Sequence, residues 1–270
     1  MEWLEWLLNR TPRLADRPAV YGAFHVGSLI IFFSLFLAMI LVRRRLPKGE
    51  RGLRVALRVF AFGLLFLEIG KQIVYSYEPG VGWSYNWSRF PFQFCSTPIY
   101  IALLAVFLHD GKLRSSLLCF LATYSPVAGC AVLFWPSSDV FSPILFLDIH
   151  TMVWHGAMLL FGLYLWLGGY VKPALRTALR AFCVYFPLNF VALALNELEH
   201  ACGFAGKYSF NMFYISRYYT CHIPLLNTVQ QKAPYPVFFA SFVLLLGFGG
   251  LFVTLVFMLI RWAERKLGKS

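Results

Sequence analysis

Residues 236–260 read PVFFASFVLLLGFGGLFVTLVFMLI and contain no charged side chain. An α-helix needs about 20 consecutive apolar residues to cross the hydrocarbon core of a bilayer, so this stretch predicts a transmembrane helix. The whole chain of 270 residues has a similar character, because 59% of its residues are hydrophobic and 13% are charged. A soluble domain carries about 25% charged residues. The sequence therefore predicts an all-α membrane protein with several spans.

Six other stretches are similarly apolar, and their apolar runs are continuous, whereas the strands of a membrane barrel alternate. Together the predicted transmembrane spans form a bundle of seven helices near residues 22–42, 55–76, 92–108, 114–135, 150–170, 178–199 and 236–260. No stretch is polar and long enough to fold alone in water, so residues 1–270 are predicted to form a single membrane domain. Residues 1–20 are predicted to be an interfacial segment that begins with a short amphipathic helix over 1–9.

The basic residues determine the predicted orientation. The larger share of the 24 Lys and Arg residues lies on one side of the membrane, around residues 43–58, 112–114, 172–180 and 261–269. By the positive-inside rule this side is the cytoplasm, so the N-terminus is outside and the C-terminus is cytoplasmic. The net charge of +12 then reflects topology and contact with anionic headgroups rather than a nucleic-acid partner. The predicted location is the cell membrane.

Polar side chains of several predicted spans lie at a similar depth in the outer half of the bilayer. At about 1.5 Å per residue, Cys95 lies roughly 6 Å and His155 roughly 8 Å below the outer boundary. On the second predicted span, Lys71 lies about 9 Å and Glu68 about 13 Å below it. Ionisable groups in hydrocarbon are costly and normally face a bundle interior or a wet cavity. The shared depth of these groups therefore predicts a functional site.

Cys95 and His155 are the predicted reactive pair. A catalytic thiol needs a nearby base, and His155 is well inside a span at the matching depth. His150, at the boundary of the same span, could serve instead. Pro98, three residues after Cys95, is expected to kink its helix and to open a polar pocket at the thiol. The alternatives are that Cys95 is a small apolar residue of the core and that His155 is a core histidine bonded to a carbonyl.

Glu68 and Lys71 are three residues apart, so they share a helix face that Gln72 continues. They either neutralise each other as an internal ion pair or line the cavity, where they would hold a phosphate or orient His155. The remaining side chains assigned to the cavity or to substrate binding are Gln93, Arg89, His150, Asn189, Asn196, Glu197 and Arg217. If the thiol attacks a carbonyl group, the site also needs oxyanion donors, and Gln93, Asn189 and Asn196 are equal candidates for that role.

A long outer loop over about 200–235 contains His200, Cys202, Cys221 and His222. Four such ligands can bind zinc, but their spacing matches no zinc pattern, so we predict no metal site. Because the outside is oxidising, a Cys202–Cys221 disulfide is expected, and two unpaired cysteines are an equal alternative.

Three segments carry a resemblance to a known family. Phe90-Pro91-Phe92-Gln93-Phe94-Cys95 resembles the Leu-Pro-Leu-His-Leu-Cys motif of the YwaF-like bacterial integral membrane proteins, with Gln93 where a histidine is usual. Residues 149–164, which contain Trp154-His155-Gly156, resemble that family's Ser-His-Gly helix, and residues 211–236 resemble its last outer loop. The resemblance covers about residues 55–260. Animal relatives of this family are similar to lysophospholipid acyltransferases, including those of ether lipids, with a cysteine–histidine pair, which implies those roles for Cys95 and His155.

The predicted function is a membrane-embedded lipid acyltransferase or acyl hydrolase with a cysteine nucleophile. Phospholipids and lysophospholipids would be its partners, and no cofactor is predicted, because the chain contains no Walker A loop or dinucleotide fingerprint. The alternatives are a transporter of small solutes or ions and a seven-helix binding protein, both using a Glu68/Lys71 cavity. The sequence leaves the lipid, the choice between transfer and hydrolysis, and the oligomeric state open.

Overall fold

The computed structural model describes residues 2–136 and 140–268 and confirms the all-α prediction. The helices are α1 (Glu2–Asn9), α2 (Ala23–Leu41), α3 (Gly49–Tyr75), α4 (Thr97–Phe107), α5 (Lys112–Phe134), α6 (Leu145–Leu167), α7 (Leu175–Cys202), α8 (Pro224–Lys232) and α9 (Tyr235–Lys266). Three short 3₁₀ helices are η1 (Trp87–Arg89), η2 (Phe94–Ser96) and η3 (Met212–Tyr214). Strands β1 (Tyr77–Glu78) and β2 (Gly82–Trp83) form a small antiparallel hairpin that pairs Tyr77 with Trp83.

Five of the described helices are long and apolar enough to cross a membrane, namely α2, α5, α6, α7 and α9. The other two predicted spans correspond to α3 and α4. Helix α3 has 27 residues but includes Arg58, Glu68 and Lys71 in its apolar part. Helix α4 has 11 residues and is only about 17 Å long, which is short against a hydrocarbon core of about 30 Å. The count of seven spans and their orientation stay predictions.

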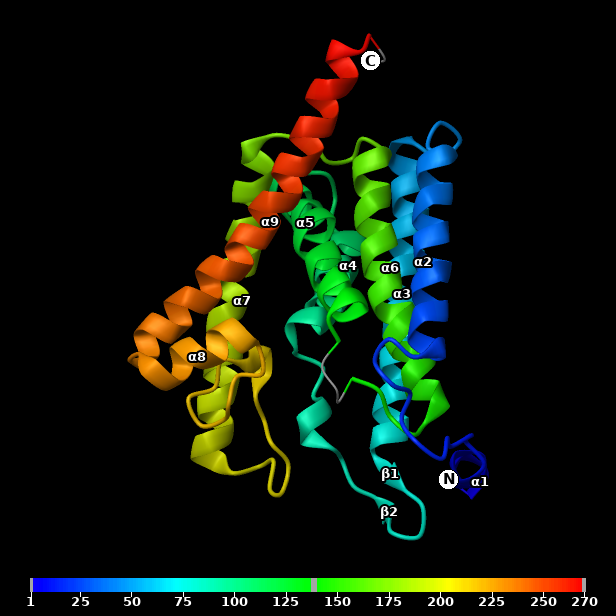
Figure 1. Ribbon diagram of the computed structural model, residues 1–270, viewed down its shortest axis with the longest axis vertical. Coiled ribbons are helices and arrows are strands. Elements are labelled where there is room, and N and C mark those ends of the chain that lie inside the picture. The colour runs from blue at the N-terminus through cyan, green and yellow to red at the C-terminus, as the bar shows by residue number, and fades with distance from the viewer. Residues whose placement is uncertain (1, 137–139, 269–270) are drawn as a thin grey trace.

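The helices form a bundle in which α5 is the central element. It packs against α4, α6, α7 and α9, and in Figure 1 it lies between α2, α3 and α6 on one side and α7 and α9 on the other. The two ends of the chain lie at opposite ends of the molecule (Figure 1). The hairpin β1–β2 and α1 lie at the end where α3 finishes and α6 begins. We call this the hairpin end.

Burial differs between the helices as expected for a bundle that faces lipid. In the most apolar 18-residue stretch of α5, 72% of the residues are buried, and large side chains such as Phe120 and Leu121 are inaccessible to solvent. In the corresponding stretches of α2 and α9, only 6% and 17% of the residues are buried. They expose large apolar side chains, Phe33 and Phe248 among them, to the surroundings. A soluble protein rarely exposes such continuous apolar surface, so these faces fit a bilayer.

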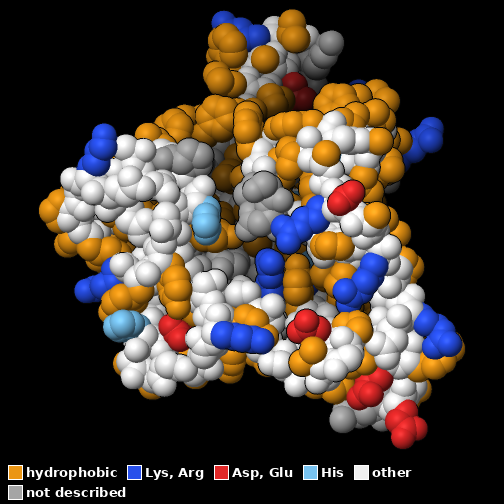
Figure 2. Space-filling view, turned by 60° about the horizontal axis from the view of Figure 1, so that its bottom comes forward, with side chains coloured by type: hydrophobic (Ala, Val, Ile, Leu, Met, Phe, Trp, Pro, Cys, Tyr) orange, Lys and Arg blue, Asp and Glu red, His pale blue; other side chains and the backbone are white. Residues whose placement is uncertain are grey.

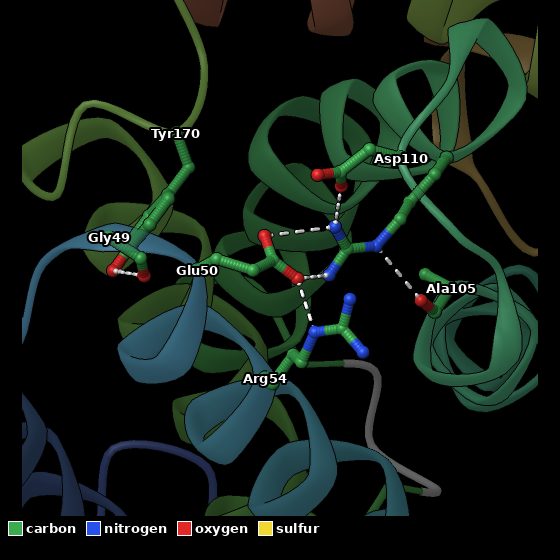
Figure 3. A network of polar contacts seen from close by, with 7 residues as sticks. Gly49, Glu50, Arg54, Ala105, Asp110 and Tyr170 are labelled. Carbon is green, nitrogen blue, oxygen red and sulfur yellow. Dashed lines mark hydrogen bonds and ion pairs between the residues drawn. The ribbon is translucent and has the colours of Figure 1, made fainter.

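At the end opposite the hairpin, one arginine forms polar contacts that connect α3, α4 and α5. The guanidinium of Arg114 on α5 is buried, and its Nη2 atom lies 2.9 Å from Oε1 of Glu50 on α3. Its Nη1 atom also pairs with Asp110, and its Nε atom donates to the carbonyl of Ala105 on α4 at 3.2 Å. Figure 3 shows Glu50 and Asp110 turned toward this guanidinium, with Arg54 donating to Glu50 from below. A buried cation is tolerated here because several acceptors surround it.

Two helix boundaries differ from the sequence predictions in ways that affect the site. Helix α4 begins at Thr97 rather than near 92, so Cys95 precedes the helix. Helix α6 begins at Leu145 rather than near 150, so His150 lies inside the helix and is buried instead of standing at its boundary. The carboxylate of Asp148 accepts the Ser142 backbone N–H at 2.7 Å, which fixes the chain entering this earlier start. Helix α1 covers the predicted 1–9 helix from residue 2 onward, and its position at a membrane interface stays a prediction.

Candidate functional site

A cavity of about 170 Å³ opens near the hairpin end of the bundle. Its lining comes from α3, the segment 88–96, α5, the chain just before α6, α6 itself and the outer loop. The lining residues are Lys71, Tyr75, Ser88, Arg89, Phe90, Gln93, Cys95, Ser96, Val132, Val140, Leu147, His150, Thr151, Trp154, His155 and Tyr214. Figure 2, which turns this end toward the viewer, shows Lys and Arg side chains gathered near the middle of the face. The structure thus brings Cys95 and His155, which are 60 positions apart in the chain, to one cavity.

The main chain at Cys95 is fixed by two contacts. Cys95 lies in η2, immediately before α4, and the indole Nε1 of Trp154 on α6 donates to its carbonyl at 3.0 Å. Thr97 Oγ1 donates to the Phe94 carbonyl at 2.8 Å and closes the turn. Pro98 lies in the first turn of α4, where a helix has no amide partner to lose. The expected proline kink inside a span is therefore wrong, and Pro98 instead starts the helix that follows the thiol.

The imidazole of His155 has a defined tautomer. Its Nδ1 atom lies 2.7 Å from the carbonyl oxygen of Thr151, one turn earlier on α6. A carbonyl only accepts, so Nδ1 carries the hydrogen, and Nε2 of the neutral ring presents a lone pair. Nε2 is buried and has no hydrogen-bond partner among the described residues. The core-histidine alternative explains one ring nitrogen and leaves the other available as a base.

No hydrogen bond joins Cys95 Sγ to either cavity histidine in the described part of the chain, although all three residues line one cavity. His150 stacks on Trp154 with ring centroids 5.2 Å apart, and its Nε2 is also buried and unpartnered among the described residues. Catalytic hydrogen bonds are often formed only when substrate is bound. Both imidazoles therefore remain candidates for the catalytic base. Only His155 has a tautomer assigned by a hydrogen bond.

Glu68 and Lys71 form the ion pair that the sequence offered as one alternative. Lys71 Nζ lies 2.7 Å from Glu68 Oε1, and Glu68 is buried. The amide Nε2 of Gln72 donates to the same carboxylate oxygen at 2.6 Å and to the Arg89 carbonyl at 2.7 Å. Lys71 also lines the cavity, with Nζ 5.9 Å from the ring centre of Trp154. The positive charge of Lys71 is thus largely neutralised before any ligand is present.

Gln93 lines the cavity, but its amide is already engaged. Its Nε2 donates to the Asn211 carbonyl at 2.8 Å, and its Oε1 accepts the Phe213 backbone N–H at 3.0 Å. The side chain therefore joins the segment that carries Cys95 to the outer loop. This contact weakens its case as an oxyanion donor.

Six of the predicted site residues lie outside the cavity lining, namely Glu68 and Gln72 beside Lys71 and four residues of α7 and the outer loop. Asn189 is buried and its amide donates to the Tyr185 carbonyl within α7 at 2.8 Å. Asn196 exchanges two hydrogen bonds with the backbone of Met212, at 3.0 and 2.7 Å. Glu197 and Arg217 pair with each other at 2.9 Å. The Asn189 amide is therefore part of the core, and Asn196 holds the outer loop against α7. Glu197 and Arg217 form a half-exposed ion pair.

The outer-loop cysteines do not form the expected disulfide. Cys202 is exposed at the end of α7, Cys221 is fully buried, and both are free thiols, which matches the alternative of two unpaired cysteines. His200 stacks on Tyr218 with ring centroids 3.5 Å apart. The described residues contain no cluster of three metal-binding side chains, so the zinc alternative has no support in that part of the chain.

Two cavity residues were missed as functional candidates. Trp154 holds the Cys95 main chain, and Thr151 fixes the His155 tautomer. The signal for Thr151 was present in the sequence, because it is four residues before His155 and such positions stack on a helix. Trp154 could not be assigned from its sequence position, since its partner lies on another segment.

The model of the TMEM164 family matches residues 20–262, which is most of the chain. No curated protein and no solved structure matches the chain.

Proposed function

The chain belongs to the TMEM164 family, and we propose that it is a membrane-embedded lipid acyltransferase or acyl hydrolase that works through a Cys95 thioester. The observation that carries the proposal is the state of His155. Because Nδ1 donates to the Thr151 carbonyl, Nε2 carries the lone pair of the neutral ring. Nε2 is buried without a partner among the described residues, and His155 lines the same cavity as Cys95. A nucleophile and an unused base in one cavity are the parts that acyl transfer needs.

In the first half-reaction, the Cys95 sulfur attacks the ester carbonyl of a phospholipid while His155 Nε2 accepts the thiol proton. The tetrahedral intermediate collapses by breaking the bond between the acyl carbon and the alcohol oxygen. His155 returns the proton to that oxygen, so a lysophospholipid leaves and a thioester remains on Cys95.

In the second half-reaction, the hydroxyl of another lysophospholipid, or a water molecule, attacks the thioester. His155 accepts its proton, the carbon–sulfur bond breaks, and the proton passes to the departing thiolate. A lysophospholipid acceptor makes the reaction a transfer, and water makes it a hydrolysis. The cycle moves an acyl group without oxidation or reduction, so no soluble cofactor is needed.

The size and location of the cavity support a lipid ester as substrate. At about 170 Å³ it is smaller than the 300–1,000 Å³ of pockets that enclose a whole small molecule. An ester group and its neighbouring atoms would enter, while the acyl chain stays among the apolar faces of the helices. Trp154 would keep Cys95 in place as the ester enters, because it holds the carbonyl of that residue.

The alternatives, transport of a small solute or ion and binding by a seven-helix protein, rest on Glu68 and Lys71. Lys71 Nζ and Glu68 Oε1 pair at 2.7 Å, which reduces the attraction of these side chains for a further ion. The inner part of the bundle is filled by the apolar core around α5, with Leu117 and Leu121 buried. The cavity at one end favours chemistry at that end over passage through the bundle.

The test uses purified protein in liposomes with an isotope-labelled phospholipid and an unlabelled lysophospholipid. We expect wild type to produce labelled acceptor or free fatty acid by mass spectrometry, and Cys95→Ala and His155→Gln to produce neither. Cys183→Ala is the matched control, because this thiol is exposed on α7 and outside the cavity lining. Undiminished product from folded Cys95→Ala would refute the thioester, and no product from wild type across several lipid classes would refute acyl chemistry.

A further inference from the structure

The cavity carries one positive charge that no described side chain neutralises. Its charged lining residues are Lys71 and Arg89. Lys71 is paired with Glu68 at 2.7 Å, whereas Arg89 forms no ion pair with a described carboxylate. The Nε atom of Arg89 is buried and has no hydrogen-bond partner among the described residues. A buried guanidinium donor without an acceptor costs free energy, so a ligand that supplies an anionic oxygen is favoured there.

We infer that Arg89 is the centre of a phosphate subsite that binds the headgroup phosphate of the lipid substrate. A guanidinium offers several N–H donors in a planar fork that matches phosphate oxygens, and it is less strongly hydrated than an ammonium group. Lys71, which is the other cation of the cavity, is the weaker candidate because Glu68 already neutralises it. The inference rests on the proposed function for the identity of the substrate, but its test measures binding alone.

The structure holds Arg89 in place before a ligand binds. Its guanidinium carbon lies 4.6 Å from the ring centre of Tyr75, which restricts the side chain by a cation–π contact. Its backbone carbonyl accepts from Gln72, so the same helix α3 fixes both main chain and side chain. Asn86 accepts the Ser88 backbone N–H at 3.1 Å and caps the short helix η1 that presents Arg89. A preorganised donor loses less conformational entropy when it binds.

The subsite lies in the right place relative to the thiol. Arg89, Gln93 and Cys95 line one cavity and belong to one short segment. In a glycerophospholipid the phosphate and the ester carbonyls are attached to the same glycerol, so a lipid that places an ester at Cys95 carries its phosphate nearby. Tyr75 also lines a second cavity of about 310 Å³, bordered by the hairpin, Arg13 and Lys207. That cavity offers room for the part of the headgroup beyond the phosphate.

The experiment measures the affinity of the full-length protein for three probes in a sugar-based detergent that contains no phosphate. The probes are a fluorescent lysophosphatidylcholine, a monoacylglycerol with the same fluorescent chain, and inorganic phosphate as a competitor. We expect Arg89→Gln to weaken lysophosphatidylcholine binding about tenfold, as for loss of a charge-assisted hydrogen bond, and to leave monoacylglycerol binding unchanged. Arg89→Lys, which keeps the charge but loses the fork, is expected to retain part of the preference.

Arg217→Gln is the matched control. Arg217 also stacks on a tyrosine, 4.7 Å from the ring centre of Tyr235, but it pairs with Glu197 and lies outside the cavity lining. Its loss should change neither affinity. Equal weakening of both lipids in Arg89→Gln, or no weakening in a folded protein, would overturn the inference. A third outcome is that inorganic phosphate competes only when Arg89 is present, while the protein binds the lysophospholipid and the monoacylglycerol equally well. That outcome would assign the subsite to free phosphate and overturn the lipid assignment.

The outcome is separable from that of the acyl-transfer experiment. The same affinities can be measured on Cys95→Ala, which has no nucleophile. A preference for the phosphate lipid in a protein without acyl-transfer activity would keep the subsite and refute the chemistry. Acyl-transfer activity, together with equal lysophosphatidylcholine affinities in wild type and Arg89→Gln, would keep the chemistry and refute the subsite.

Discussion

Removal of the Gln93 amide is expected to release the outer loop from the segment that carries Cys95. The loop contains two non-glycine residues in the left-handed region, Phe213 with φ 57° and Tyr214 with φ 59°. Each such residue costs on the order of 1–2 kcal/mol, so the loop keeps this shape only while other contacts offset the strain. Gln93 supplies two of those contacts, to the Asn211 carbonyl and the Phe213 N–H.

The magnitude follows from which partners Gln93→Ala would leave unpaired. The Asn211 carbonyl keeps a hydrogen bond from the Tyr214 N–H at 3.2 Å, so its loss is about 1 kcal/mol. The Phe213 N–H loses the Gln93 acceptor, and Phe213 is only 1% exposed, which keeps water away and adds about 1–3 kcal/mol. The sum of about 2–4 kcal/mol corresponds to a fall in amide protection of roughly 30-fold or more.

Hydrogen exchange read by mass spectrometry on peptides covering residues 208–218 would measure this change. Gln93→Glu keeps the acceptor for Phe213 and loses the donor to Asn211, so its effect should be intermediate. Gln231→Ala removes a comparable amide from an exposed hydrogen bond on α8, and it should leave protection of these peptides unchanged. Protection within twofold of wild type in Gln93→Ala would refute the reasoning, because the strained loop would then be held by other contacts.

Two further predictions concern packing and pH. A Cβ at Gly129 would lie 2.6 Å from the His155 carbonyl oxygen, so Gly129→Ala should separate α5 from α6 and destabilise the protein by about 1–3 kcal/mol. Gly63→Ala, with nothing within 4 Å, is its control in thermal unfolding, and equal midpoints would contradict the close approach. The hydrogen bond from Arg114 keeps the pKa of Glu50 below its usual value of 4.5. The ionised Glu50 therefore stabilises the folded protein above pH 4.5, and this stabilisation is lost as pH falls through the lower pKa of the folded state. Glu50→Gln should flatten the fall of the unfolding midpoint in acid. Parallel plots of midpoint against pH for wild type and variant would contradict this.

Composition and depth along the helices were available from the sequence. The apolar stretches are long enough to require helices in lipid, and α2, α5, α6, α7 and α9 confirm five of them. The rise per residue is fixed by backbone geometry, so depth could be estimated without a structure. Cys95 and His155 were placed at one level in this way, and they line one cavity.

Depth is one coordinate, and the rotation of each helix and the identity of its neighbours are decided only by tertiary packing. Asn189 and Asn196 were both assigned to the cavity or to substrate binding, yet one bonds within α7 and the other bonds to the outer loop. The Trp154 contact to Cys95 and the Gln93 contact to residues 211–213 join distant segments, so no local pattern reports them. The sequence by itself determined that this is a helical membrane protein, because helix length and apolar composition decide that. It also predicted the depth of the polar groups from the rise per residue. The structure decided which of those groups share the cavity, because that depends on how helix faces meet.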